Sequence, residues 1–182
     1  FIDIIRGELR RVDRIVEEFL LSTKSRVPFI PENLHGIIED VVVILAEKAR
    51  IKNIALTNRT ERDIVVECQK ERLKQAFYNL VVNGIESIST AGAVEIWSEG
   101  SGKTAVIYVR DTGSGIKQEE LRSIFEYYYT TKDKGMGLGL PISYMIVKDH
   151  GGDIKVFSEK GKGTTFTITL PFTQPNAQKM SG

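Results

Sequence analysis

The chain has 182 residues, of which 41% are hydrophobic and 27% charged, with a formal net charge of +1. This length and composition predict one ordinary globular domain with a short attachment. The near-neutral charge lacks the strongly basic balance of nucleic-acid-binding proteins, and no apolar run approaches the roughly 20 residues that cross a bilayer. We therefore expect no nucleic-acid partner, no membrane contact from this segment and a cytoplasmic location, whether or not the full-length protein is membrane-bound. The single cysteine, Cys68, excludes an internal disulfide.

The first 27 residues carry a heptad pattern of apolar side chains. The positions are spaced alternately three and four apart and are Ile2, Ile5, Leu9, Val12, Val16 and Phe19. A second apolar stripe widens this face beyond what one helix can bury alone. We predict that residues 1–27 form a long helix of a bundle shared with a second subunit, giving a homodimer. Packing of the helix on its own domain is the alternative.

The run SRVPFIPEN at 25–33 contains two prolines and predicts a hinge or linker. Residues 28–172 then alternate helical and β-rich patterns in a single domain, and a polar tail covers 173–182. We predict helices over about 34–49, 71–89, 117–125 and 140–150. We predict strands over 51–58, 63–69, 93–99, 103–111, 153–160 and 163–171.

The stretch GSGKT at 100–104 resembles the end of a phosphate-binding P-loop, but its context is wrong. That motif needs a glycine where this chain has Trp97, and a helix where a predicted strand follows Thr104. We interpret the stretch as a hairpin turn between two strands, in which glycines supply positive φ angles.

Polar side chains share one face of the predicted helix over 71–89. Asn79, Asn83 and Glu86 are four and three residues apart, and the opposite face is apolar. Oxygen ligands in such a row can complete the shell of Mg²⁺, which keeps several waters and takes few protein ligands. A solvated polar face is the commoner interpretation of a lone stripe.

Three glycine-rich segments follow. In DTGSGI at 111–116, Asp111 ends a strand and can accept a hydrogen bond from an exocyclic amine such as that of adenine; a plain β-turn is the alternative. In GMGLGLP at 135–141, glycines precede a helix and form a natural anion site. In GKGTTF at 161–166, a glycine turn makes Thr164 and Thr165 available to a base or its water.

Taken in order, the Asn-bearing helix, DTGSGI, IFEYYYTTK, GMGLGL, HGGDI and GKGTTFTITLP resemble the catalytic ATP-binding domain of bacterial sensor histidine kinases. This family shares its fold with the gyrase, Hsp90 and MutL ATPases, and the narrower likeness is to the sporulation kinases of bacilli. The resemblance covers roughly residues 30–172. It implies an α+β fold, a two-layer sandwich of a mixed sheet with helices on one face, preceded by the bundle helix.

The resemblance also implies ATP and Mg²⁺ and assigns residues to them. Asn83 would be the Mg²⁺ ligand, with Asn79 a second ligand or a phosphate contact. Adenine would meet a set that comprises Asp111, Gly113, Gly115, Ile116 and Thr164. The triphosphate would meet the start of the last long helix and the preceding lid, that is Lys132, Gly135, Gly137, Leu138, Gly139 and Leu140. Glu86 departs from the family, in which many members have a lysine at that place.

Family resemblance implies transfer of the γ-phosphoryl group to a histidine on the helical bundle and then to an aspartate of a response regulator receiver domain. His35 and His150 lack the acceptor motif, so we interpret both as structural and expect the acceptor helix upstream of Phe1. A regulatory or inhibitory protein could also dock on the bundle. The alternatives are an ATP-binding regulatory or scaffold module without kinase activity and a serine kinase of the anti-sigma-factor type.

Overall fold

The computed structural model describes residues 27–130 and 136–174. A five-stranded mixed sheet forms its centre, in the strand order β2-β4-β5-β7-β6. Strand β2 runs parallel to β4, and the other neighbours are antiparallel. The strands are β2 (Ile54–Arg59), β4 (Gly92–Ser101), β5 (Thr104–Asp111), β6 (Asp153–Glu159) and β7 (Gly163–Pro171).

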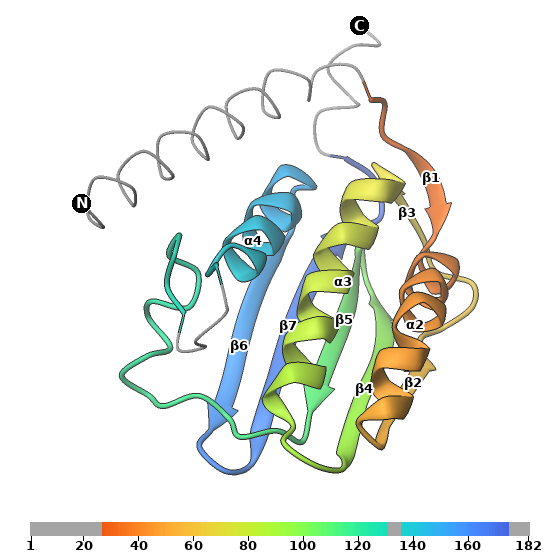
Figure 1. The fold of residues 1–182 in the computed structure, drawn as a ribbon. Helices are drawn as coiled ribbons and strands as arrows, with labels where there is room; N and C mark the ends of the chain where they lie inside the picture. Colours follow the sequence, from red (N-terminus) through yellow and green to blue (C-terminus); the bar gives the residue numbers. More distant parts are fainter. Residues whose placement is uncertain (1–26, 131–135, 175–182) are drawn as a thin grey trace, which may run out of the picture.

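Three helices cover one face of this sheet: α2 (Leu34–Ile51), α3 (Lys70–Ser87) and α4 (Gly139–Asp149) (Figure 1). The predicted α+β sandwich with helices on one face is confirmed. The bundle helix predicted over residues 1–27 lies outside the described residues apart from Val27.

Helix α2 begins at a side-chain cap and is held by one apolar stripe. Asn33 Oδ1 accepts a hydrogen bond from the Gly36 N–H over 2.9 Å, which satisfies one of the free donors of the first turn. The apolar stripe of this helix is buried, and it comprises Leu34, Ile38, Val41, Leu45 and Ala49. Burial of this stripe against the sheet fixes the direction of α2.

Helix α3 lies over the middle of the sheet and approaches it closely. Its apolar face is buried and includes Leu73, Phe77 and Leu80. At Gly84 an added Cβ would lie 3.2 Å from Asp111 Cβ and 3.3 Å from Val94 Cγ2. The absence of a side chain at Gly84 therefore lets α3 lie directly against β4 and β5, and this turns Asn83 and Glu86 away from the sheet.

The stretch GSGKT forms the tight turn between β4 and β5, as the sequence predicted. Ser101 pairs with Thr104, and Gly102 adopts a φ of +60°. Cys68 is buried in a strand, and burial raises the pKa of its thiol to about 12. The thiol therefore stays protonated at neutral pH.

Two segments differ from the sequence-based expectation. Part of the predicted hinge is a strand, β1 (Ile30–Asn33), which pairs antiparallel with β3 (Val65–Cys68). The predicted helix over 117–125 is a series of turns in which the N–H groups of Glu120, Ser123 and Glu126 donate to the carbonyl three residues earlier. So short a segment has little helical stability of its own. Its one buried residue is Ile124.

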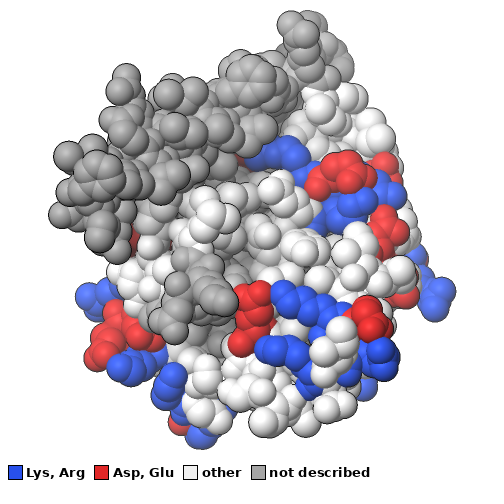
Figure 2. All heavy atoms as spheres, viewed as in Figure 1, with Lys and Arg blue, Asp and Glu red and all other residues white. Residues whose placement is uncertain are grey.

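Charged side chains of both signs are interspersed on the face that the helices cover (Figure 2). Between α2 and α3 they form ion pairs, among them Lys70–Asp40 and Lys74–Asp40, which lie 3.6 and 3.7 Å apart. Within the two described ranges, every helix is too short or too polar to cross a bilayer.

Candidate functional site

A cleft of about 640 Å³ lies between α3, the start of α4, the loop after β5 and strand β7. This volume is within the range of small-molecule sites. Most of the residues that the sequence singled out meet here, since its lining includes Asn83, Asp111, Gly115, Ile116, Gly137, Leu138, Gly139, Leu140 and Thr164.

A row of buried polar side chains on three neighbouring strands forms the floor of the cleft, at Asp111 and Thr164, and supports it from beneath, at Ser158. Asp111 on β5 pairs with Thr164 on β7, and Thr164 pairs with Ser158 on β6. All three are at most 5% exposed. Residues directly opposite in a sheet point to the same face, and Asp111 faces α3 at Gly84. The row is therefore turned toward the helices.

The carboxylate of Asp111 is held by two donors. Its Oδ1 accepts a hydrogen bond from the Gly113 N–H over 2.8 Å and lies 3.0 Å from the Ser87 hydroxyl, whose single proton is shared between this carboxylate and the Gly84 carbonyl at 2.8 Å. Gly113 does not line the cleft. A Cβ there would lie 1.8 Å from Ser87 Oγ, so its role is to let the loop pack against α3.

One wall of the cleft is the polar face of α3, with Asn83, Glu86 and Ser87. Glu86 forms a 2.8 Å ion pair with Lys48 of α2. Asn79 is not among the residues that line the cleft; its Nδ2 donates to the Gly139 carbonyl over 3.1 Å. Of the three polar residues predicted to share one face of this helix, Asn83 and Glu86 line the cleft, whereas Asn79 joins α3 to α4.

Two glycines of the opposite wall adopt φ angles that other residues avoid. Gly115 has a φ of +64°, and an added Cβ would lie 2.1 Å from the Glu159 carbonyl oxygen. Gly137 has a φ of +67°, and its added Cβ would lie 2.5 Å from the Tyr128 carbonyl carbon. Both positions need glycine, because backbone from another segment occupies the space of the side chain.

Helix α4 begins at the edge of the cleft, and its N-cap residue makes no side-chain capping hydrogen bond. Leu138 is at its N-cap and has no polar side chain to accept the first N–H groups. The first-turn residues Gly139, Leu140 and Pro141 line the cleft. A helix N-terminus of this kind attracts an anion.

The segment before α4 is tied to the rim of the cleft. Tyr128, with a φ of +65°, donates its N–H to the Gly137 carbonyl over 3.1 Å. Tyr129 lines the cleft, and its partial burial, with the nearby Glu120, raises the pKa of its phenol. Lys132 and Gly135, predicted as phosphate contacts, lie outside the described residues.

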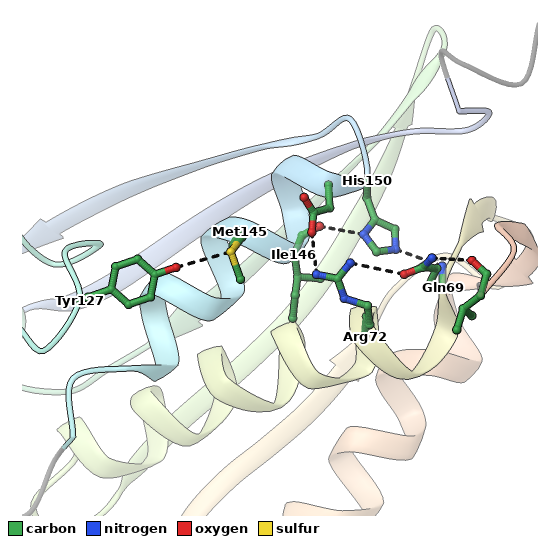
Figure 3. Close-up of polar contacts among 8 residues, drawn as sticks. Gln69, Arg72, Tyr127, Met145, Ile146 and His150 are labelled. Carbon is green, nitrogen blue, oxygen red and sulfur yellow. Dashed lines mark hydrogen bonds and ion pairs between the residues drawn. The ribbon is translucent and has the colours of Figure 1, made fainter. Parts of the chain in front are cut away.

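Both histidines are engaged in structural hydrogen bonds, as expected. His150, at the end of α4, is buried, with Nδ1 2.7 Å from the Ile146 carbonyl oxygen, while Nε2 accepts the Gln69 N–H over 3.0 Å (Figure 3). A carbonyl only accepts and an amide N–H only donates, so His150 is neutral with its proton on Nδ1. His35 Nδ1 lies 2.9 Å from Thr60 Oγ1.

Sequence reasoning missed the two serines that support the floor of the cleft. Ser87 follows Asn83 by one helical turn and so shares its face. Ser158 follows Ile154 and Val156 at the alternate positions of β6, where a third apolar residue is expected. A polar residue in an inward-facing position is the signal that could have identified it.

Residues 68–174 match the family model described as histidine kinase-, DNA gyrase B-, and HSP90-like ATPase. The chain belongs to this ATPase family. It is 39% identical to sporulation kinase C of Bacillus subtilis (strain 168) over 174 residues, which are 94% of this chain and 41% of that protein. It is 36% identical to the sensor histidine kinase ZraS of Escherichia coli (strain K12) over 171 residues, 92% of this chain and 37% of that protein. The chain thus spans about two fifths of these curated relatives.

Solved structures give the same family. The catalytic domain of histidine kinase ThkA, in a nucleotide-free form, superposes with a TM-score of 0.74 at 36% identity, covering 80% of this chain and 97% of that one. Histidine kinase ThkA in complex with response regulator protein TrrA gives a TM-score of 0.73 at 35% identity, covering 94% of this chain and 50% of that one. The described fold is that of the ATPase domains of histidine kinases.

Proposed function

We propose that this chain is the catalytic module of an ATP-dependent protein histidine kinase and that it binds Mg-ATP in the cleft described above. One observation carries the proposal: a single cleft brings together the buried carboxylate of Asp111, the amide of Asn83 and the uncapped start of α4. These features suit the three parts of the ligand, which are a base with an exocyclic amine, a metal ion and a chain of phosphates.

The adenine would lie at the floor of the cleft. Asp111 would accept a hydrogen bond from the exocyclic amine, in a position held by the Gly113 N–H and the Ser87 hydroxyl. Gly115 and Ile116 would lie beside the base, since both line the cleft. Thr164 is the neighbour of Asp111 on the floor and would complete the contact with the base.

The phosphates would lie toward the start of α4. The backbone N–H groups of Gly139 and Leu140, in the first turn of this helix, would donate hydrogen bonds to the phosphates. Gly137 would lie just before this turn. Lys132 and Gly135 of the adjoining lid would also contact the phosphates. Among the described residues of the lining, the carboxylates are Glu86, Asp111 and Glu120, and the one ammonium group is that of Lys160. A triphosphate therefore needs an additional cation here.

Mg²⁺ fits this requirement. It binds oxygen ligands, keeps several waters and is held by one or two protein groups together with phosphates. The amide oxygen of Asn83 is the protein ligand that we assign, and Asn79 would contribute by fixing the start of α4. When bound, Mg²⁺ would neutralise charge on the phosphates.

The chain's own residues would position ATP for transfer. A neutral imidazole nitrogen would attack the γ-phosphorus, the bond from that phosphorus to the β,γ-bridging oxygen would break, and ADP would leave. Neither histidine of this chain suits the role, since His150 is buried with both nitrogens bonded and His35 is bonded to Thr60. We therefore infer that the acceptor lies on a helical bundle outside this sequence.

Further partners follow from this role. The phosphoryl group would pass from the bundle to an aspartate of a response regulator receiver domain, a partner supported by the ThkA–TrrA complex. Residues 1–27 would contribute a bundle helix and make the protein a homodimer. A regulatory or inhibitory protein could dock on the same bundle.

Binding of Mg-ATP tests the site. We expect the wild-type chain to bind Mg-ATP in calorimetric titration and Asn83→Ala to lose binding while keeping its circular dichroism spectrum. Asn58→Ala is the matched control, because Asn58 is a half-buried asparagine on β2 that does not line the cleft. Unchanged affinity in Asn83→Ala would overturn the assignment of the site.

Phosphoryl transfer tests the activity. With γ-labelled ATP and a histidine-bearing helical hairpin from a sporulation kinase, we expect label on the hairpin that is lost in acid and stable in alkali, as for an N–P bond. Acid-stable label on serine would favour the serine-kinase alternative. Mg-ATP binding without transfer, also in a version of the protein that carries its own acceptor helix, would favour the regulatory module.

A further inference from the structure

The hydroxyl of Ser158 lies at the centre of three contacts beneath the floor of the cleft. It accepts the Ile116 N–H over 2.8 Å, lies 2.9 Å from the Gly163 carbonyl oxygen and lies 2.9 Å from Thr164 Oγ1. The side chain is 1% exposed, so water does not compete for these contacts. One partner comes from the loop after β5, and the other two are the first two residues of β7.

The directions of these hydrogen bonds follow from the number of protons. The Ile116 amide can only donate, the Gly163 carbonyl can only accept, and Ser158 has a single proton. One arrangement satisfies all three contacts at once: Ser158 donates to the Gly163 carbonyl, and Thr164 donates to Ser158. Buried polar groups adopt such fully paired arrangements because an unmade hydrogen bond is costly.

This hydrogen-bond arrangement determines what Thr164 can offer to a ligand in the cleft. Thr164 has given its one proton to Ser158, so its oxygen presents only lone pairs to a ligand. Its neighbour Asp111 also presents acceptors when ionised. The floor of the cleft therefore accepts hydrogen bonds and does not donate them. An amine suits it, whereas a carbonyl oxygen in the same place finds no donor.

We propose that Ser158 is a specificity-determining positioning residue, which selects a purine with an amine over one with a carbonyl at the same ring position by holding the proton of Thr164. This inference rests on the proposed function, since it concerns the base of the nucleotide in the same cleft. Ser158 acts through Thr164 and does not itself line the cleft.

The experiment compares the Mg²⁺ salts of ATP and inosine triphosphate, which carry an amine and a carbonyl at that position. In wild type we expect ATP to bind more tightly. Ser158→Ala releases the proton of Thr164, which can then donate to the carbonyl. The dissociation constant of inosine triphosphate divided by that of ATP should fall by about fivefold, which corresponds to the free energy of one neutral hydrogen bond.

Two controls separate this effect from a general loosening of the sheet. Ser98→Ala removes another buried serine hydroxyl of the same sheet, one that accepts the Glu61 N–H and lies outside the lining, and should leave the ratio unchanged. In a Thr164→Val background, which lacks the hydroxyl, Ser158→Ala should have no further effect on the ratio. A further fall there would overturn the proposal.

The remaining outcomes are also decisive. If Ser158→Ala does not fold, Ser158→Cys takes its place, because a thiol is a weak acceptor and should lower the ratio too. A wild-type chain that binds ATP and keeps its preference in both variants contradicts the role of Ser158 alone. A wild-type chain that binds neither nucleotide refutes the proposed function and this inference with it.

Discussion

Asn79 Nδ2 donates a hydrogen bond to the Gly139 carbonyl over 3.1 Å, and this bond fastens the middle of α3 to the first residue of α4. The two helices carry the two parts of the proposed phosphate site. Asn83 lies one turn further along α3, and the first-turn residues Gly139 and Leu140 of α4 line the cleft. The separation of these parts therefore depends on a side chain that is not in the lining.

Asn79→Ala should loosen this connection. We expect the free energy of unfolding to fall by about 1 kcal/mol, the contribution of one such hydrogen bond, and the affinity for ATP to fall by the same factor with Mg²⁺ and with a chelator. Denaturant unfolding and calorimetric titration measure the two effects. A loss of affinity confined to the Mg²⁺ condition would instead make Asn79 a metal ligand.

Asp111→Asn should lower the preference for adenine. The amide keeps an oxygen for the Gly113 N–H but replaces an acceptor by a donor, so the contact with an exocyclic amine is weakened and a carbonyl is accommodated. Hydrogen bonds to a charged group contribute about 1.5–3 kcal/mol, so the preference for ATP over inosine triphosphate should fall by roughly ten- to a hundredfold. Competition binding measures this ratio.

Glu120→Gln provides the comparison for Asp111→Asn, since Glu120 is another carboxylate of the lining and its side chain accepts the Lys117 N–H. The preference of Glu120→Gln for ATP over inosine triphosphate should equal that of wild type. Equal preference in Asp111→Asn would refute the assignment of Asp111 to the base.

Gly115→Ala should be more damaging than Gly102→Ala, although the two glycines have nearly the same φ, +64° and +60°. An alanine at either position adopts an unfavourable backbone conformation, at a cost of about 1–3 kcal/mol. An added Cβ at Gly102 meets nothing within 4 Å, whereas at Gly115 it lies 2.1 Å from a backbone oxygen. The difference between the two unfolding free energies isolates this steric clash, and similar values would contradict the geometry of the loop.

His150 should make folding sensitive to mild acid. Burial lowers the pKa of its imidazole below the ordinary 6.5, and the nearby positive charge of Arg72 lowers it further. The hydrogen bond to the Ile146 carbonyl and the charge of Asp149 oppose this shift but do not cancel it. The unfolded chain therefore binds a proton at a pH where the folded chain does not. The stability that neutral His150 contributes to the folded state is fully present above about pH 6.5. It is lost as the pH falls from there through the lowered pKa of the folded state.

Urea unfolding of wild type and His150→Gln between pH 7.5 and 5.5 measures this dependence. The two proteins differ only at residue 150, so the difference between their unfolding free energies isolates the contribution of His150. We expect the stability advantage of wild type over His150→Gln to shrink as the pH falls. A constant difference would show that His150 does not titrate differently in the two states.

Most helices and strands follow from periodicity and turn residues in the sequence. The apolar stripe of α2 and the turn at Gly102 needed nothing beyond local patterns, because helix faces and tight turns depend on neighbouring residues. Strand β1 was not predicted, because its pairing with Val65–Cys68 involves a distant segment and the two prolines at 28 and 31 indicate a break. Residues 117–125 have a helical composition but form turns.

The residue types of the candidate site were also evident in the sequence. Asn83, Asp111, Gly115, Gly137 and Thr164 were all predicted, and all line one cleft. Asn79 was predicted on the same helix face as Asn83. One face of a long helix can contact more than one segment, and here α4 lies beside Asn79, so its amide donates to the Gly139 carbonyl.

The amino-acid sequence alone predicted which residues would bind a nucleotide and its metal, since glycines, amides and a carboxylate carry that chemistry in any context. Folding settled how they are oriented: the register of β5, β7 and β6 places Asp111, Thr164 and Ser158 in one row. Strands β5 and β7 pair although α4 and β6 lie between them in the sequence, so this register depends on the packing of distant segments. For this reason the contact of Ser158 with Thr164, and the direction of the hydrogen bond between them, emerge only from the three-dimensional arrangement.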